Sequence, residues 1–284
     1  MTAWLMLVTA VLPPQQDFTW RGDLRAGQVL AVENIVGNVR VEPGTGRRAE
    51  VVAIKRAGRR GDPGDVEVTA HESGDGVRFC VWYPGMRNAE PRDRAGARDG
   101  CWSWRGRGGR DSNHERNDTE VEFVVRLPAG VRLVAGTVSG SVDARGVSAQ
   151  AEVTSVSGDV RVDGFSGEEL EAKTVSGHID LTGVRAERVG AETVSGNVTY
   201  DGGIVRDGNY EFKTLSGRVL VTLPAGAGAE VRASTFSGRV RLPEGATAET
   251  TNRRRNRVTG RIGAGGATLW VESFSGNVDV RVGR

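Results

Sequence analysis

The sequence has few of the residues that build metal or redox sites. Its 284 residues include only two cysteines, three histidines and three lysines, and His71, His114 and His178 lie in unrelated contexts. Neither cysteine belongs to a CxxC motif or has a histidine nearby at metal-ligand spacing, which argues against zinc. We therefore expect no bound metal and no cofactor.

Long apolar runs and an excess of charge of one sign are also missing. No segment approaches eighteen consecutive apolar residues, so the mature chain is expected to have no transmembrane segment. The 38 basic and 36 acidic residues leave a net charge of +2, so no overall field attracts nucleic acid or an anionic membrane. Nucleic acid is therefore not an expected partner.

Common catalytic and structural signatures are absent as well. The serines that precede glycine lie in no GxSxG elbow, and the glycine-rich phrases lack the strand-to-helix context of a phosphate loop. The calcium-binding nonapeptide is missing, and glycine has no three-residue period, which excludes collagen.

The N-terminus and the cysteines indicate the compartment. Residues 4–12 form an apolar run of the length of a signal-peptide core, so residues 1–16 are predicted to be a signal peptide and the protein to be exported to the periplasm or cell surface. A buried first strand is the alternative. In an exported chain Cys80 and Cys101 are expected to form a disulfide, and two buried thiols are the alternative.

The 41 glycines are partly explained by an internal repeat. From residue 137 onward the phrase Thr/Ser-Val-Ser-Gly-x-Val recurs in eight copies, with an earlier relative at residues 34–39. Successive glycines are 18, 19, 19, 21, 21, 22 and 16 residues apart. The glycines are Gly140, Gly158, Gly177, Gly196, Gly217, Gly238, Gly260 in a degraded copy, and Gly276.

Each copy alternates between apolar and polar residues. Val156, Gly158 and Val160 share one parity, while Ser155 and Ser157 have the other. Such alternation predicts a half-buried strand with its valines inward and its hydroxyls outward. Because the glycine has the parity of the core, it predicts a bend where stacked backbones approach closely. A bulge at the glycine is the alternative, and it would reverse the facing beyond it.

These units predict an all-β fold, a parallel β-solenoid with about 16–22 residues per turn. One unit cannot bury its apolar side alone, so units must stack, and eight turns spaced about 4.8 Å apart would form a rod roughly 40 Å long. Right-handed coiling is expected from the crossover rule. An antiparallel sandwich is the alternative.

Three regions follow from this pattern. After the signal peptide, residues 17–130 are predicted to be a longer-stranded N-terminal capping region, and residues 131–284 the Ser-Gly repeat solenoid. The capping region contains an Arg/Gly-rich insert at residues 85–118, expected to be a surface loop. Its Trp102 and Trp104 either pack the loop onto the body or form a platform for carbohydrate.

The iterated phrase resembles that of an exported bacterial β-strand-repeat family of adhesins of unknown function. Residues 121–140, an alternating strand followed by Leu-Pro-Ala-Gly-Val, are similar to that family's entry into its repeats. The resemblance covers about residues 28–284 and implies a right-handed β-helix at the cell envelope. In some relatives it implies association with membrane-stress modules. It implies no catalytic residues.

The repeat also places candidate binding residues in columns. One outward column is expected to hold Thr137, Ser155, Thr174, Thr193, Thr214, Thr235 and Ser273. The next is the candidate binding ladder for a glycan: Ser139, Ser157, Ser176, Ser195, Ser216, Ser237, Thr259 and Ser275. A third column is chemically mixed: Ser141, Asp159, His178, Asn197, Arg218, Arg239, Arg261 and Asn277. The alternative is that Ser and Thr merely suit solvated strands near corners.

Positive charge is concentrated at Arg253, Arg254, Arg255 and Arg257. These arginines form a candidate anion patch for phosphate-rich polysaccharide or lipid headgroups, or simply a solvated loop. No interleaved aromatic residues support nucleic-acid binding there.

Taken together, the sequence predicts a non-enzymatic, exported, adhesin-like or cell-envelope structural and interaction module. Its partner would be an envelope polysaccharide or protein. A sensor or regulatory partner in a membrane-stress system is one alternative. A β-helix carbohydrate-active enzyme is the other, and it would need paired carboxylates among residues such as Asp159, Asp180 and Asp279. These three acids lie at outward strand positions and are expected to be solvated members of a polar face.

Overall fold

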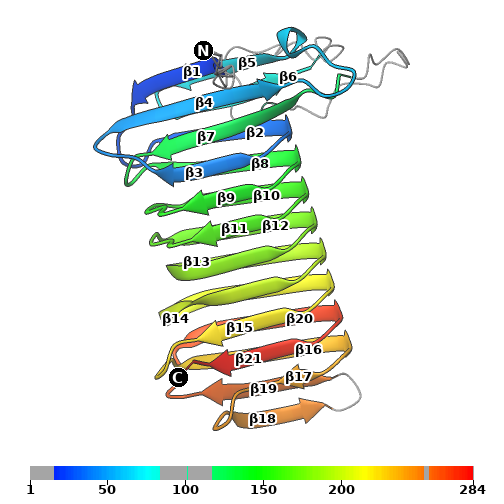
Figure 1. Ribbon diagram of the computed structural model, residues 1–284. Helices are drawn as coiled ribbons and strands as arrows, with labels where there is room; N and C mark the ends of the chain where they lie inside the picture. Colours follow the sequence, from blue (N-terminus) through cyan, green and yellow to red (C-terminus); the bar gives the residue numbers. More distant parts are fainter. Residues whose placement is uncertain (1–15, 84–100, 102–116, 253–255, 284) are drawn as a thin grey trace, which may run out of the picture.

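The computed structural model describes residues 16–83, 101, 117–252 and 256–283 (Figure 1). The described part of the chain is all-β, with one short 3-10 turn at Pro63–Asp65, as the repeat predicts. The predicted signal peptide, most of the insert, and Arg253 to Arg255 lie outside the described residues. Gln16 already belongs to the first strand, β1 (Gln16–Asp23).

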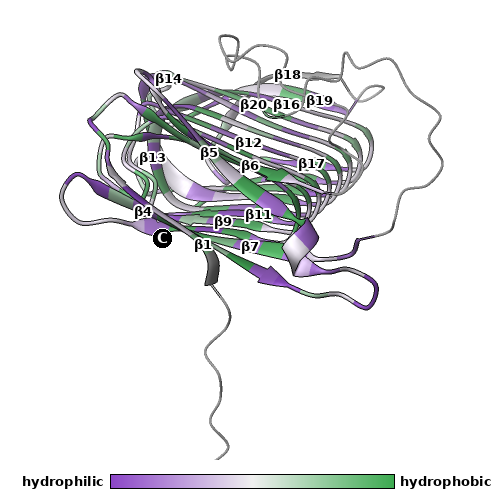
Figure 2. Cartoon of the chain, turned by 90° about the horizontal axis from the view of Figure 1, so that it is seen from above, coloured by the Kyte–Doolittle hydropathy of each residue, from purple (hydrophilic) through white to green (hydrophobic). Residues whose placement is uncertain are grey.

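Each central turn contributes strands to two faces of a parallel stack. In stacking order, the first face holds β2 (Val29–Val36), β8 (Arg132–Ser139), β10 (Ala151–Ser157), β12 (Glu169–Ser176), the later parts of β13 (Ile179–Ser195) and β14 (Val198–Ser216), then β20 (Ala267–Ser275) and β16 (Ala229–Ser237). The second face holds β3 (Val39–Pro43), β9 (Val142–Arg145), β11 (Val160–Asp163), the starts of β13 and β14, β15 (Val219–Leu223), β21 (Val278–Val282) and β17 (Val240–Arg241). Viewed from above in Figure 2, successive turns superpose around one interior. The solenoid-like stacking matches the prediction, and its handedness stays a prediction.

The turns do not stack in the order of the sequence. The last turn, β20 and β21, pairs with β14 and β15 on one side and with β16 and β17 on the other. The C-terminal strands therefore lie inside the stack, between turns that are consecutive in the chain (Figure 1).

Antiparallel strands close both ends of the stack. At the C-terminal end, β18 (Thr247–Asn252) and β19 (Arg257–Ile262) form a hairpin that pairs with β16. The degraded copy, which lies on β19, runs antiparallel to the other copies, and its Thr259 pairs with Arg232. The prediction that Thr259 and Arg261 belong to the repeat columns was therefore wrong. At the N-terminal end, β7 (Glu120–Leu127), β4 (Arg48–Arg56) and β1 pair antiparallel, and β5 (Glu67–Ser73) pairs with β6 (Gly76–Trp82).

The N-terminal strands join the same sheet as the repeats. β2 and β3 pair with β8 and β9, so the early relative at residues 34–39 stacks directly on the first later copy. The division of the chain at residue 130 stays a prediction.

The facing of the strands changes at each corner. Leu170, Ala172 and Thr174 are buried on β12, and the next buried side chain is Ile179, five residues after Thr174. Side chains that alternate strictly would stay on one side only at even separations. The corner therefore reverses the parity, as the alternative of a bulge at the glycine would require. The prediction that Val156 and its equivalents point inward was wrong, because they precede the reversal: Val156 is 46% exposed.

The repeated glycine is required by the close approach of neighbouring turns. A Cβ on Gly158 would lie less than 3.0 Å from the carbonyl oxygen of Gly140, and one on Gly177 would meet that of Gly158 in the same way. These obstacles are backbone atoms that cannot rotate away. The predicted close approach at the glycine is thus what the corner contains.

Replacing one corner glycine should destabilise the stack. For Gly158→Ala we expect a loss of more than about 1 kcal/mol in the free energy of unfolding, since the methyl group must displace the backbone of Gly140. Gly74→Ala is the matched control, because a Cβ there meets nothing within 4 Å. Urea unfolding of both variants is the measurement, and equal stabilities would contradict this account of the corner.

Removing the last turn should disrupt the middle of the fold rather than shorten it. A chain ending at residue 266 loses the strands between β14 and β16, so two internal edges would lose their partners. We expect loss of cooperative thermal unfolding, followed by circular dichroism. Removing only Gly283 and Arg284, which follow β21, is the control. A truncated chain that still melts cooperatively at an unchanged temperature would contradict the inserted arrangement.

Candidate binding surface

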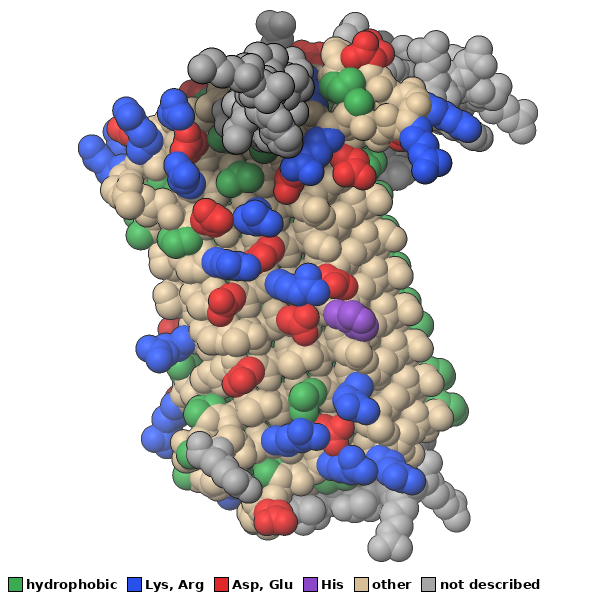
Figure 3. All heavy atoms as spheres, viewed as in Figure 1, with side chains coloured by type: hydrophobic (Ala, Val, Ile, Leu, Met, Phe, Trp, Pro, Cys, Tyr) green, Lys and Arg blue, Asp and Glu red, His purple; other side chains and the backbone are tan. Residues whose placement is uncertain are grey.

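One corner of the stack carries two exposed columns side by side. The predicted serine ladder is exposed: Ser139, Ser157, Ser176, Ser195, Ser216, Ser275 and Ser237. Directly beside it lies an apolar column that the alternating pattern predicts to be in the core. In stacking order its members are Val138, Val156, Val175, Val194, Leu215, Phe274 and Phe236. Hydrophobic side chains follow one another along this edge in Figure 3.

The exposure of the apolar column is large and continuous. Its members are between 43% and 74% exposed, and Phe236 is the most exposed of them. The rings of Phe236 and Phe274 stack with centroids 4.8 Å apart. On the same outer face Trp270 is 43% exposed, and the Lys213 ammonium lies 4.9 Å from the centre of its ring. Single exposed apolar residues are ordinary, but an unbroken column of them makes this corner a candidate interaction surface.

The column of Thr and Ser that was expected to face solvent is buried instead. Thr174 donates a hydrogen bond from Oγ1 to the carbonyl of Gly158 at 2.9 Å, and Thr193 does the same to Gly177 at 3.1 Å. The same bond is made by Thr137, Ser155, Thr214, Thr235 and Ser273. Each hydroxyl satisfies a corner carbonyl of the neighbouring turn, so this column is a structural part of the corner.

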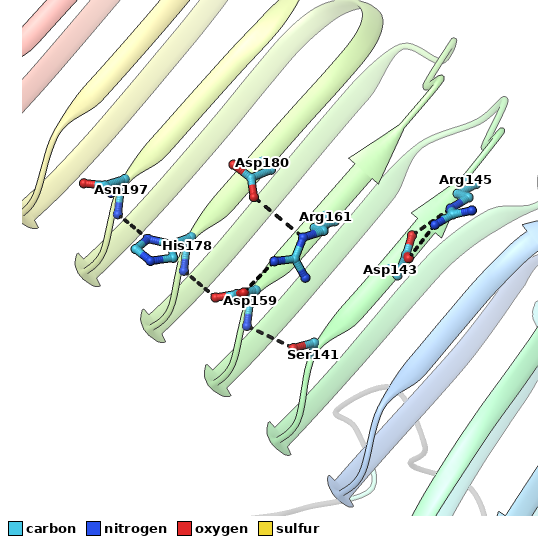
Figure 4. A network of polar contacts seen from close by, with 8 residues as sticks. All are labelled: Ser141, Asp143, Arg145, Asp159, Arg161, His178, Asp180 and Asn197. Atoms are coloured by element: carbon cyan, nitrogen blue, oxygen red, sulfur yellow. Dashed lines mark hydrogen bonds and ion pairs between the residues drawn. The ribbon is translucent and has the colours of Figure 1, made fainter.

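The members of the chemically mixed column other than arginine share one ability, to accept a hydrogen bond. Asp159 accepts from the backbone N–H of His178 at 2.9 Å, and His178 Nδ1 accepts from that of Asn197 at 3.0 Å (Figure 4). Asn38, Ser141, Asn197 and Asn277 accept in the same way from the turn beside them. Each side chain satisfies the N–H that follows the corner glycine.

Arginine engages the acids that a carbohydrate-active enzyme would need. Arg161 Nη2 lies 2.7 Å from Asp159 and its Nε lies 3.7 Å from Asp180, and Arg145 pairs with Asp143 (Figure 4). The N–H of His178, with a further contribution from Arg161, lowers the pKa of Asp159. A general acid needs a raised pKa, so Asp159 is unsuited to that role.

Asp279 was expected to be solvated, and that expectation was wrong. It is only 2% exposed, because in its column it lies between Leu220 and Arg241. Its carboxylate is 3.5 Å from Arg241 Nη1 and 4.0 Å from Arg218 Nε. It therefore neutralises arginines of the adjoining turns.

Cys80 and Cys101 form the predicted disulfide, with their Cα atoms 5.7 Å apart. The backbone N–H of Cys101 donates to Glu33 at 2.7 Å, and the other carboxylate oxygen of Glu33 pairs with Arg78. The disulfide and the hydrogen bond to Glu33 tie Cys101, in the middle of the insert, to β6 and β2. The candidate platform of Trp102 and Trp104 lies outside the described residues.

The candidate anion patch is described only at Arg257, an exposed residue at the start of β19. Within residues 16–83, 101, 117–252 and 256–283, no group of three or more His, Cys, Asp or Glu side chains could hold a metal ion. The part of the chain that the structure describes also contains no helix long and apolar enough to cross a bilayer.

Comparison with known proteins gives one family match and distant structural likenesses. The family model Toastrack DUF4097 matches residues 130–281. A "putative cell adhesion protein" from Clostridium sporogenes ATCC 15579 is 13% identical, with 94% of this chain and 99% of that chain covered and a TM-score of 0.38. A "putative adhesin" from Bacteroides fragilis NCTC 9343 is 9% identical, with 94% and 98% covered and a TM-score of 0.48. No curated protein matches the chain.

Asp159 should stabilise the fold in a pH-dependent way. Because its pKa is lower in the folded chain than in the unfolded one, its contribution is complete above the unfolded value of about 4 and disappears as the pH falls through the folded value. At pH 7 we expect Asp159→Ala to cost about 1–2 kcal/mol. Asp159→Asn should cost less, since the amide oxygen still accepts from His178.

Urea unfolding at pH 7 and pH 3 measures this difference. The gap in the free energy of unfolding between the wild type and Asp159→Asn should be smaller at pH 3 than at pH 7, because the stabilisation by the wild-type carboxylate decreases below the unfolded-state pKa of about 4. A gap that stays constant or widens in acid would contradict the assigned role.

Proposed function

We propose that this chain, which belongs to the Toastrack DUF4097 family, is an exported, non-enzymatic, adhesin-like module that acts by contact along its exposed corner. The observation that carries the proposal is the apolar column of seven side chains, unbroken from Val138 to Phe236. Water contact along such a column is unfavourable by roughly 25 cal/mol per Å² of apolar area, so a partner that covers it gains binding energy.

The neighbouring groups support a binding role over a catalytic one. The serine ladder beside the apolar column supplies donors and acceptors for the polar rim of an interface. The carboxylates Asp159, Asp180 and Asp279 are held by arginines or backbone N–H groups. The disulfide between Cys80 and Cys101 is compatible with an oxidising compartment outside the cytoplasm.

Retention of the purified, fluorescently labelled protein on isolated cell envelopes of its source organism tests this function. The variant Val175→Ser/Phe236→Ser/Phe274→Ser should lose at least about tenfold in retention. It removes apolar area at three rungs of the column, where a rung is the position that one strand contributes. Leu220→Ser is the matched control, since Leu220 is a partly exposed apolar residue on the second face. Circular dichroism verifies that all variants are folded.

Two outcomes would contradict the proposed function. One is equal retention of the triple variant and the wild type. The other is release of soluble sugar from the envelopes at a rate proportional to the amount of protein, which would indicate an enzyme.

A further inference from the structure

We propose that the partner of the apolar column is a second copy of this chain, packed antiparallel on the same column. This inference rests on the proposed function, since it names the partner of that corner. Three independent properties of the column support it: its spacing, its size pattern and the charges beside it.

The spacing of the column fits another stack of strands. Its side chains repeat with the strand separation of about 4.8 Å. An α-helix laid along it repeats every 5.4 Å and would drift by about 3 Å over five steps, and an extended peptide presents a side chain to one face only every 6.6–6.8 Å. A second solenoid has the same repeat, so its side chains can interdigitate along the whole contact.

The sizes along the column are complementary to themselves on reversal. The six rungs from β10 to β16 carry three valines followed by three larger residues: Val156, Val175, Val194, Leu215, Phe274 and Phe236. A two-fold axis between β13 and β14, parallel to the strands, places each valine opposite a larger residue of the other copy. Across the interface, Val194 of one copy would contact Leu215 of the other, Val175 would contact Phe274, and Val156 would contact Phe236.

The charges beside the column select the same register. Two residues before each apolar side chain, the outer face carries Lys173, Glu192, Lys213 and Glu272 on four successive rungs. Reversal about the same axis sets Lys173 against Glu272 and Glu192 against Lys213 of the other copy, giving four opposite-charge pairs. The flanking rungs set Thr154 against Ser234, both polar and neutral. A shift by one rung would set like charges against each other.

The same alternation also stabilises the single chain, in which Lys173 pairs with Glu171, and Lys213 with Glu211. The test must therefore separate contacts between copies from contacts within one copy. The surface is about 25 Å long and a few side chains wide, well below a standard interface, so we expect a weak dimer with a Kd of micromolar or above.

Sedimentation velocity over a range of concentrations up to about 1 mM measures the self-association. We expect a monomer–dimer equilibrium whose Kd rises at least about tenfold in Lys173→Glu and in Glu272→Lys, because each variant sets two like-charge pairs across the two-fold axis. An equimolar mixture of these two variants should recover the wild-type Kd, since the introduced glutamate faces the introduced lysine and the native pair is kept. A change in intrachain stability cannot produce this recovery.

Several results would overturn the proposal. They are a monomer at every concentration, a dimer unaffected by Val175→Ser/Phe236→Ser/Phe274→Ser, and a variant mixture as weak as its components. Envelopes from cells that lack this chain distinguish the failure of this inference from that of the proposed function. Retention on them that depends on the apolar column would keep the binding role and assign it to another partner, such as a glycan.

Discussion

The close contact between corner glycines is the constraint on which the parallel stack depends. The carbonyl of Gly158 accepts the hydroxyl of Thr174 from the next turn, and it occupies the place where a Cβ on Gly177 would lie. Glycine and threonine thus act as one unit: the first allows the backbones to approach, and the second satisfies the carbonyl that this approach buries. Because the unit recurs in each parallel turn, it holds the strands on both sides in register.

This unit also explains which parts of the fold could be predicted. The repeat and its alternation are enough to predict strands, stacking and glycine at a close approach. They give the wrong prediction for which side chains point inward before the glycine, since hydropathy alone favours Val175 inside and Thr174 outside. A buried acceptor at the corner makes the opposite arrangement favourable, and that acceptor comes from another turn. The five-residue separation of Thr174 and Ile179 was the available signal, because both could be buried only if the parity changed.

The order in which the turns stack could not be predicted from the sequence, for a related reason. Copies with nearly identical phrases present nearly identical strand edges, so the pattern specifies register but not which copy lies next to which. The turn that contains Gly217 therefore packs against the turn that contains Gly276, and not against the one that contains Gly238. The antiparallel hairpin of β18 and β19 occupies the end of the stack where a further parallel turn would otherwise lie. The degraded copy and its uneven spacing mark this hairpin in the sequence, although they do not reveal its direction.

The apolar column is the feature that the corner itself does not require. The corner needs Thr or Ser on one side and Ser-Gly on the other, and the residue between them points outward and makes none of these hydrogen bonds. A β-branched residue there suits the strand, which accounts for the four valines. It does not account for Leu215, Phe274 and Phe236, which are the three most exposed members of the column and lie together near one end of the stack. The stacking of Phe236 on Phe274 links two of these side chains between adjacent turns, but it does not cover them. The proposed second copy would cover all three, because it sets a smaller valine against each of them.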